Sequence, residues 1–173
     1  NSGPEADLIS ADADNGGVYF VPAFTGMGAP CWDMYARGCI TGLTRGTTRA
    51  NIVRAALESI AFQTNDLLTA MQEDTGMSLS VLKVDGGASR SDVLLQLQAD
   101  LLQASVERPS NTETTAQGAA FMAGIGVGLW NDEEEIASMR HTSQSFVPRM
   151  DDRSRTNLLA GWKQAVGQTL YKG

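Results

Sequence analysis

The sequence predicts an α/β domain in which layers of helix pack on a largely parallel or mixed sheet. Short β-rich runs alternate with longer segments whose apolar residues recur at helical spacing. The 173 residues are 42% hydrophobic, which is enough for one globular domain with a core. Because ligands of such sheets bind at the carboxyl ends of strands, the turns that follow strands are the places to search for a site.

A loop rich in glycine and proline separates the first two predicted strands. The strands are expected at residues 18–22 and 39–43. The loop between them, residues 23–38, is long for a compact domain, which favours a functional or interface role. Within this loop we expect Asp33 to make hydrogen bonds or an interdomain contact, and Arg37 to anchor the loop.

The apolar residues then take up the period of a helix. They predict one long amphipathic helix over residues 50–74. Thr48 or Asn51 can cap its start, and Gly76 can supply the left-handed residue just past its end. The residues that define the apolar face are Val53, Leu57, Ile60, Thr64, Leu67 and Met71.

The second half of the chain continues the alternation of strands and helices. Strands are expected at residues 79–84 and 105–107, and helices at 91–103, 114–129, 132–139 and 151–171. The buried side of the terminal helix is predicted to consist of Leu158, Leu159, Trp162, Ala165, Val166 and Leu170.

Small residues form a stripe along the helix predicted at residues 114–129. Each glycine costs an interior helix position about 1 kcal/mol relative to alanine, so the stripe needs a compensating use. Close packing against a neighbouring helix or sheet is the simpler use, and contact with a ligand is the other. The stripe consists of Ala116, Ala120, Gly124 and Gly128.

Composition excludes several functional classes. The net charge is −7 and no Lys/Arg cluster is present, so we expect no nucleic-acid partner. The longest apolar run, residues 118–130, is too short to span a membrane. Cys31 and Cys39 favour reduced thiols in a cytoplasmic protein. They do not form a metal-ligand set with His141, which lies in a polar run and is expected at the surface.

The twin glycines Gly86 and Gly87 end one predicted strand and precede a helix. Backbone N–H groups converge at such a position, and glycine lets a phosphate or ribose approach the main chain. Ser89 and Asp92 fit a capping box for the helix, and Ser91 could cap it instead. The segment is neither a Walker A loop nor a G-x-G-x-x-G turn. By itself, it is explained as well by a simple turn as by a ligand site.

Longer segments add a resemblance to a known family. Residues 17–68 are similar to the carboxy-terminal half of the FGGY carbohydrate kinases. The pattern Gly38-x-Ile40-x-Gly42-Leu43, followed by Ala55-x-x-Glu58, resembles a signature of that family. "VDGGASRSD" resembles its adenosine-binding turn, and "ETTAQGAAFMAGIGVGLW" resembles the helix after that turn.

The resemblance implies an actin-like, ribonuclease H-like ATPase fold, with a mixed sheet and helices on both faces. It implies a kinase whose two domains close over a cleft that holds ATP or ADP and Mg²⁺, the metal ion being held mainly through the phosphates. The segment "PAFTGMGAPCWD" points to glycerol as the phosphoryl acceptor, giving glycerol 3-phosphate. Cytoplasmic location and a homo-oligomer in the full-length protein are further implications.

The resemblance also suggests roles for individual residues. Gly87 matches a glycine that contacts the nucleotide, and Ser91 stands where family members usually have a nucleotide-contacting Asn. Gly86, Ala88 and Asp85 would shape the turn. On the helix that follows, Gly118 and Ala119 would line or buttress the adenine side, with helix packing as the alternative.

Other parts of the kinase are expected outside this sequence. We expect residues 1–16 to be a linker and residues 17–173 to belong to the ATP-binding domain. The catalytic base and the amino-terminal domain are expected upstream, so no residue here is assigned a catalytic role and this piece alone should be inactive. Two alternatives stay open, namely another FGGY enzyme such as a pentulose kinase, and a non-kinase actin-like nucleotide-binding module.

Overall fold

Five short strands form two separate sheets in the computed structural model, which describes residues 14–138 and 142–170. In the first sheet, β1 (Tyr19–Val21) pairs antiparallel with β2 (Cys39–Thr41). The second sheet has the order β3-β4-β5, in which β3 and β4 are parallel and β4 and β5 antiparallel. These strands are β3 (Val81–Lys83), β4 (Ser105–Pro109) and β5 (Thr142–Phe146).

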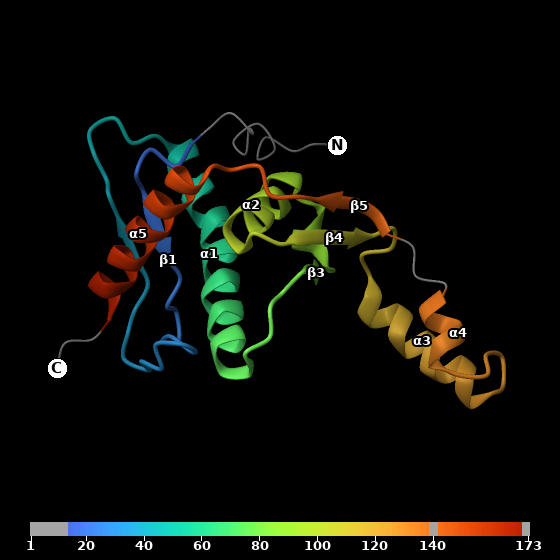
Figure 1. The fold of residues 1–173 in the computed structure, drawn as a ribbon. Coiled ribbons are helices and arrows are strands. Elements are labelled where there is room, and N and C mark those ends of the chain that lie inside the picture. Colours follow the sequence, from blue (N-terminus) through green and yellow to red (C-terminus); the bar gives the residue numbers. More distant parts are fainter. Residues whose placement is uncertain (1–13, 139–141, 171–173) are drawn as a thin grey trace.

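Helices alternate with these strands, as predicted (Figure 1). They are α1 (Arg49–Thr75), α2 (Asp92–Leu102), α3 (Thr114–Gly126), α4 (Glu133–Ser138) and α5 (Asp152–Thr169). Strand β5 was not predicted, because only its last residue is buried and its polar sequence carries no strand pattern. His141 and residues 1–13 lie outside the described residues, so the expected surface position of His141 and the expected linker stay predictions.

The ends of α1 follow from the residues that flank it. The Thr48 hydroxyl accepts a hydrogen bond from the N–H of Asn51, and the Asn51 side chain accepts one from the N–H of Thr48. This reciprocal pair satisfies donors that the first helical turn leaves without partners. At the other end Gly76 has a φ of 68° and donates to Gln72, so both predicted caps are confirmed.

The buried face of α1 differs in part from the predicted one, since Leu57 packs against the main core but three other predicted positions do not. Ile60, Leu67 and Met71 are exposed, so their assignment to the core is wrong for this chain. Apart from Phe62, the residues that α1 buries are small or polar, and the helix lies against β1 and α2. The residues buried on α1 are Ala55, Glu58, Ser59, Ala61, Phe62 and Asn65.

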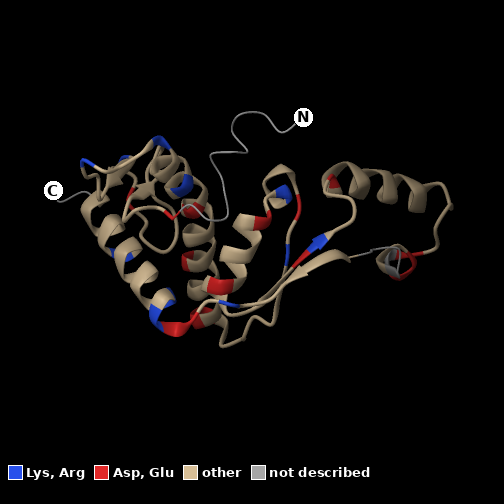
Figure 2. Ribbon diagram, turned by 90° about the horizontal axis from the view of Figure 1, so that it is seen from above, with Lys and Arg blue, Asp and Glu red and all other residues tan. Residues whose placement is uncertain are grey.

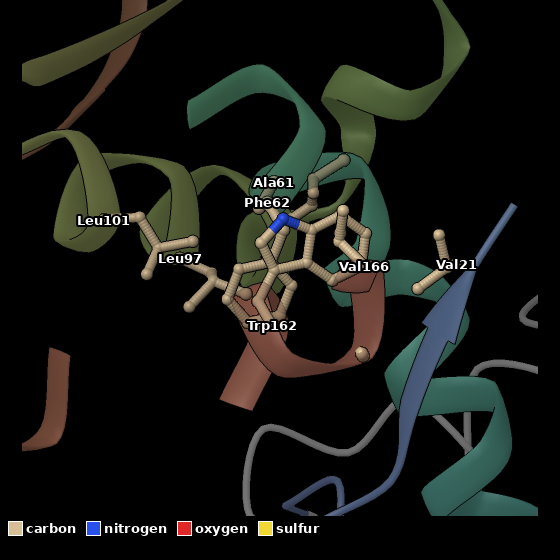
Figure 3. Close-up of a cluster of buried hydrophobic side chains, with 9 residues drawn as sticks. Val21, Ala61, Phe62, Leu97, Leu101, Trp162 and Val166 are labelled. Atoms are coloured by element: carbon tan, nitrogen blue, oxygen red, sulfur yellow. The ribbon is translucent and has the colours of Figure 1, made fainter. Parts of the chain in front are cut away.

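Packing between α1, α2, α5 and β1 forms the main core (Figure 3). The rings of Trp162 and Phe62 stack with centroids 5.0 Å apart. Val21 contributes from β1, while Leu97 and Leu101 contribute from α2. The buried side predicted for α5 is confirmed, since its residues are either fully buried or packed against this core.

A second, smaller core joins α2 to the three-stranded sheet. Leu95 and Ala99 of α2 are buried against Val106 of β4 and Phe146 of β5. This contact holds the start of α2 next to the end of β3 and thereby positions the glycine turn between them.

Helices α3 and α4 lie beyond the end of the second sheet (Figure 1). Close packing of the small-residue stripe against a neighbouring helix or sheet is wrong for most of its length, because Ala116, Ala120 and Gly128 are exposed. Only Gly124 is buried, and a Cβ there would lie 2.1 Å from the ring of Trp130. The glycine therefore admits an aromatic ring from the segment that follows α3.

Both cysteines, Cys31 and Cys39, are free thiols, as expected. Within the described ranges, the helices are too short or too polar to cross a bilayer.

Candidate functional site

The turn after β3 has a backbone shape that requires glycine. Gly86 has φ 76° and ψ 179°, a combination that is essentially limited to glycine. Residues 87–90 then form a single 3-10 turn, and α2 begins at Asp92. The chain thus passes from strand to helix within a few residues.

The outer side of this turn is open. A Cβ at Gly86 or Gly87 would meet no atom within 4 Å, and Gly87 and Ala88 are exposed. No side chain caps the 3-10 turn. A planar or anionic group could therefore rest against the main chain here without displacing a side chain.

Serines hold the turn from the inside. The buried Ser89 hydroxyl donates to the carbonyl of Gly86 at 2.7 Å. Ser91 caps α2 by accepting from the N–H of Leu94 at 3.3 Å. The capping box expected from Ser89 and Asp92 is therefore wrong, and the alternative cap is confirmed. The Ser91 hydroxyl can still donate its own hydrogen to a ligand.

Arg108 of β4 stabilises the turn by hydrogen bonds, a role that the sequence analysis missed. Its guanidinium donates to the carbonyl of Ser89 at 3.0 Å and to the carboxylate of Asp92 at 2.8 Å. It also donates to the Gln144 side chain and lies over the ring of Phe146 at 5.6 Å. An arginine at the end of a strand carries no local signal for this role, because its partners come from three other segments.

The segment that leads into α3 meets the other side of the turn. The N–H of Gly86 donates to the carbonyl of Thr112 at 2.9 Å, and the Thr114 hydroxyl donates to Asp85. Arg90 and Glu113 form an exposed ion pair at 3.2 Å, which should add little stability. The turn and the start of α3 are thus joined as one unit.

A cavity of about 390 Å³ lies beside this unit, between the sheet, α3 and α4. It contains Lys83 and Gly118, whereas Ala119 is exposed outside it. Apart from Glu113 at its start, α3 brings no charge to this region (Figure 2). The walls are formed by Lys83, Pro109, Ser110, Asn111, Thr114, Gln117, Gly118, Phe121, Ile136 and Ala137.

The structure therefore places Gly86, Gly87, Ala88 and Ser91 in one open turn, with Gly118 in the adjoining cavity. It tests none of them as nucleotide contacts, and that role stays a prediction. In the described part of the chain, no three His, Cys, Asp or Glu side chains are grouped so that they could hold a metal ion.

An open strand-turn-helix unit joined to a following helix is the arrangement that the sequence resemblance led us to expect. Residues 2–127 match the model of the FGGY family of carbohydrate kinases, C-terminal domain. The chain belongs to this family.

Similar proteins of known name are glycerol kinases. The chain is 61% identical over 155 residues to the glycerol kinase of Clostridium botulinum (strain Alaska E43 / Type E3). The aligned region covers 90% of this chain and 31% of the relative. It is 57% identical over 163 residues to glycerol kinase 2 of Sulfolobus acidocaldarius, covering 94% of this chain and 33% of the relative. The chain thus spans about a third of the length of the curated relatives it matches.

Solved structures agree on the fold. The crystal structure of Plasmodium falciparum glycerol kinase with ADP matches all of this chain and 35% of that protein, with a TM-score of 0.85 and 35% identity. A ligand-bound xylulose kinase from Lactobacillus acidophilus matches 95% of this chain and 34% of that protein, with a TM-score of 0.74 and 25% identity. The predicted kinase fold, α/β with a mixed sheet, is confirmed by these neighbours.

Proposed function

We propose that this chain is the nucleotide-binding part of an ATP-dependent glycerol kinase, which converts ATP and glycerol into ADP and glycerol 3-phosphate. The observation that carries the proposal is the open glycine turn in a chain that is 61% identical to a protein named glycerol kinase. The neighbour with a TM-score of 0.85 is a glycerol kinase with ADP, which supports a nucleotide as the ligand.

In this proposal the turn binds the nucleotide through its main chain. Gly87 and Ala88 are exposed, so their N–H groups would donate to the nucleotide, and the Ser91 hydroxyl can donate one more hydrogen bond. Gly86 provides the backbone shape that exposes these groups. Phosphoryl transfer depends mainly on positioning and charge neutralisation, so this part of the protein contributes orientation.

Mg²⁺ would reach this site with the nucleotide. We infer that the ion is held mainly through the phosphates. The ion would neutralise phosphate charge during transfer.

The remaining two thirds of a full-length relative would supply what is missing here. We place the catalytic base, most of the glycerol site and the rest of the phosphate clamp in that portion, so this piece alone should not turn over substrate. We also propose a cytoplasmic, homo-oligomeric enzyme.

A coupled assay on the full-length polypeptide tests the proposal. Glycerol-dependent ADP release is expected, with much lower turnover on xylulose and ribulose. A preference for either pentulose would change the proposed activity from glycerol kinase to pentulose kinase. The similarity to a xylulose kinase structure supports this alternative. ADP binding with no polyol-dependent release would instead indicate a nucleotide-binding module without kinase activity.

A further inference from the structure

A groove of about 460 Å³ lies between α1, α5 and the loop that joins β1 to β2. In Figure 1 α1 lies between α5 and β3, so the groove is on the other side of α1 from the strand that ends in the glycine turn. The groove shares no lining residue with the cavity beside that turn. Its volume is that of a site for a small molecule.

One wall of the groove is apolar and rigid. Helix α5 and the residue that follows it contribute Leu159, Trp162, Val166 and Leu170. The Trp162 ring is held in place because it stacks on Phe62 of the main core (Figure 3). A wall that is already ordered loses little entropy when a ligand binds, which favours binding.

The loop contributes Pro30 and Cys31 to the opposite wall. Met27 and Asp33 exchange two backbone hydrogen bonds of 2.7 and 2.9 Å around this part of the loop. The Asp33 carboxylate accepts from two main-chain N–H groups, and the Arg37 side chain donates to two main-chain carbonyls. The hydrogen bonds expected from Asp33 and the anchoring role expected for Arg37 are thus confirmed, and they fix this wall.

A partly buried carboxylate, that of Asp66, lines the groove. Its Oδ2 accepts a hydrogen bond of 2.6 Å from Trp162. The three ion pairs found among residues 14–138 and 142–170 do not include Asp66. Burial raises the pKa of Asp66, although hydrogen bonds from Trp162 and Asn65 oppose the shift. A carboxylate responds in this way when its charge is only partly compensated, so Asp66 suits a cationic partner.

We propose that the groove binds a small molecule with an apolar body and one ammonium group, which pairs with the Asp66 carboxylate. The body would lie against Leu159, Trp162 and Val166, so that both chemical features of the groove are used. Lys163 also lines the groove and is exposed, so its charge disfavours a second cationic group at the mouth. A cleft that combines apolar walls with a carboxyl of perturbed pKa has the features of a binding site.

The test uses the full-length polypeptide that contains this chain, titrated in a calorimeter with three compounds. Phenylbutylamine, phenylbutanol and phenylbutyrate share one apolar body and differ in the charge of the head group. We expect the amine to bind at millimolar concentration or below, and the other two to bind at least about tenfold more weakly, because only the amine makes a charged hydrogen bond with Asp66.

Substitution of Asp66 separates the charge from the shape of the groove. Asp66→Asn keeps an acceptor for Trp162 and should weaken phenylbutylamine at least about tenfold while leaving phenylbutanol unchanged. Asp74→Asn makes the same change of charge at an exposed position of α1 and should leave the affinity for the amine unchanged. An equal loss in the two variants would mean that only the net charge matters, and would overturn the proposal.

The two cysteines report where the compound binds. Cys31 lines the groove and Cys39 does not, although both are partly exposed free thiols. Phenylbutylamine should slow the alkylation of Cys31 by iodoacetamide and leave that of Cys39 unchanged, as measured by mass spectrometry of the peptides. Gly167→Leu adds a side chain to an open glycine that lines the groove, and should weaken the amine and the alcohol alike.

Three further results would overturn the proposal. They are no binding of phenylbutylamine to the full-length polypeptide, equal affinity for the amine and the alcohol, and binding that leaves the alkylation of Cys31 unchanged. ADP titration of the same samples reports on the nucleotide site separately. Failure to bind ADP would count against the proposed function only, because the groove and the cavity beside the glycine turn share no residue.

Discussion

Arg108 donates a hydrogen bond of 3.0 Å to the carbonyl of Ser89, and so connects β4 to the turn that follows β3. The same nitrogen donates to Asp92 at the start of α2. One guanidinium therefore ties together the three segments that form the candidate site. The shape of the exposed main chain depends on a side chain that does not itself lie in the turn.

Replacing Arg108 with glutamine should loosen the turn and weaken the protein. Loss of hydrogen bonds to the Ser89 carbonyl and Asp92 should lower the free energy of unfolding by about 1–3 kcal/mol, and ADP affinity should fall with it. Urea unfolding and calorimetric ADP titration measure the two effects. Arg90→Gln removes only an exposed ion pair and serves as the control for stability, with a change in the free energy of unfolding near zero. Equal behaviour of the two variants would contradict the role given to Arg108.

A branched side chain at Gly87 should block the nucleotide and leave the fold intact. A Cβ at this position meets no protein atom within 4 Å, so Gly87→Val should unfold at nearly the wild-type temperature. Its ADP affinity should fall by at least about tenfold, because the side chain occupies the space above the main chain. Gly167→Val, at an equally open glycine of α5, is the matched control. ADP affinity in Gly87→Val equal to that of the control would remove Gly87 from the site.

The Asp66 carboxylate should make stability depend on pH. It accepts a hydrogen bond of 2.6 Å from Trp162, but burial is the larger influence and raises its pKa above the ordinary value of 3.8. The folded state therefore binds the proton more tightly than the unfolded state does. Protonation of Asp66 stabilises the folded state fully below pH 3.8, and this stabilisation is lost as the pH rises through the folded-state pKa.

Asp66→Asn keeps an acceptor for Trp162 and removes the titration. We expect the variant to be more stable than the wild type at neutral pH, with the difference shrinking as the pH is lowered below the ordinary carboxyl pKa. Denaturant unfolding of both proteins at neutral pH and below pH 3.8 measures this difference in the free energy of unfolding. A difference that grows on acidification would show that the pKa of Asp66 is lowered rather than raised.

Gly161→Ala should destabilise the main core. A Cβ at this position would lie 2.2 Å from the hydroxyl oxygen of Tyr19, whose ring packs against Phe62. Overpacking of this kind costs about 1–3 kcal/mol, which thermal unfolding would detect. Gly167→Ala on the same helix meets open space and should be neutral or slightly stabilising. A similar unfolding temperature for both variants would show that Tyr19 can move aside.

Local patterns were sufficient for the helices, for every strand except β5, and for the position of the turn. The Thr48 cap, the left-handed Gly76 and the buried side of α5 depend on neighbouring residues or on helical spacing, and they are confirmed. Spacing did not identify the buried face of α1, because its apolar positions at Ile60, Leu67 and Met71 are exposed. Which face a helix buries depends on the elements beside it, and α1 lies against β1 and α2.

By itself, the sequence determined that a strand ends in two glycines before a helix, and that its longer segments resemble one kinase family. The structure explains the first glycine, because the backbone conformation of Gly86 is essentially limited to that residue type. Only the tertiary structure decided that Arg108 supports the turn, that Ser91 rather than Ser89 caps α2, and that the β1–β2 loop presents its aromatic residues to solvent. Arg108 acts through contacts between segments distant in the chain. Ser89 is not the cap because it lies in the 3-10 turn, where its hydroxyl donates to Gly86. The exposure of the loop depends on which surfaces the packing leaves uncovered.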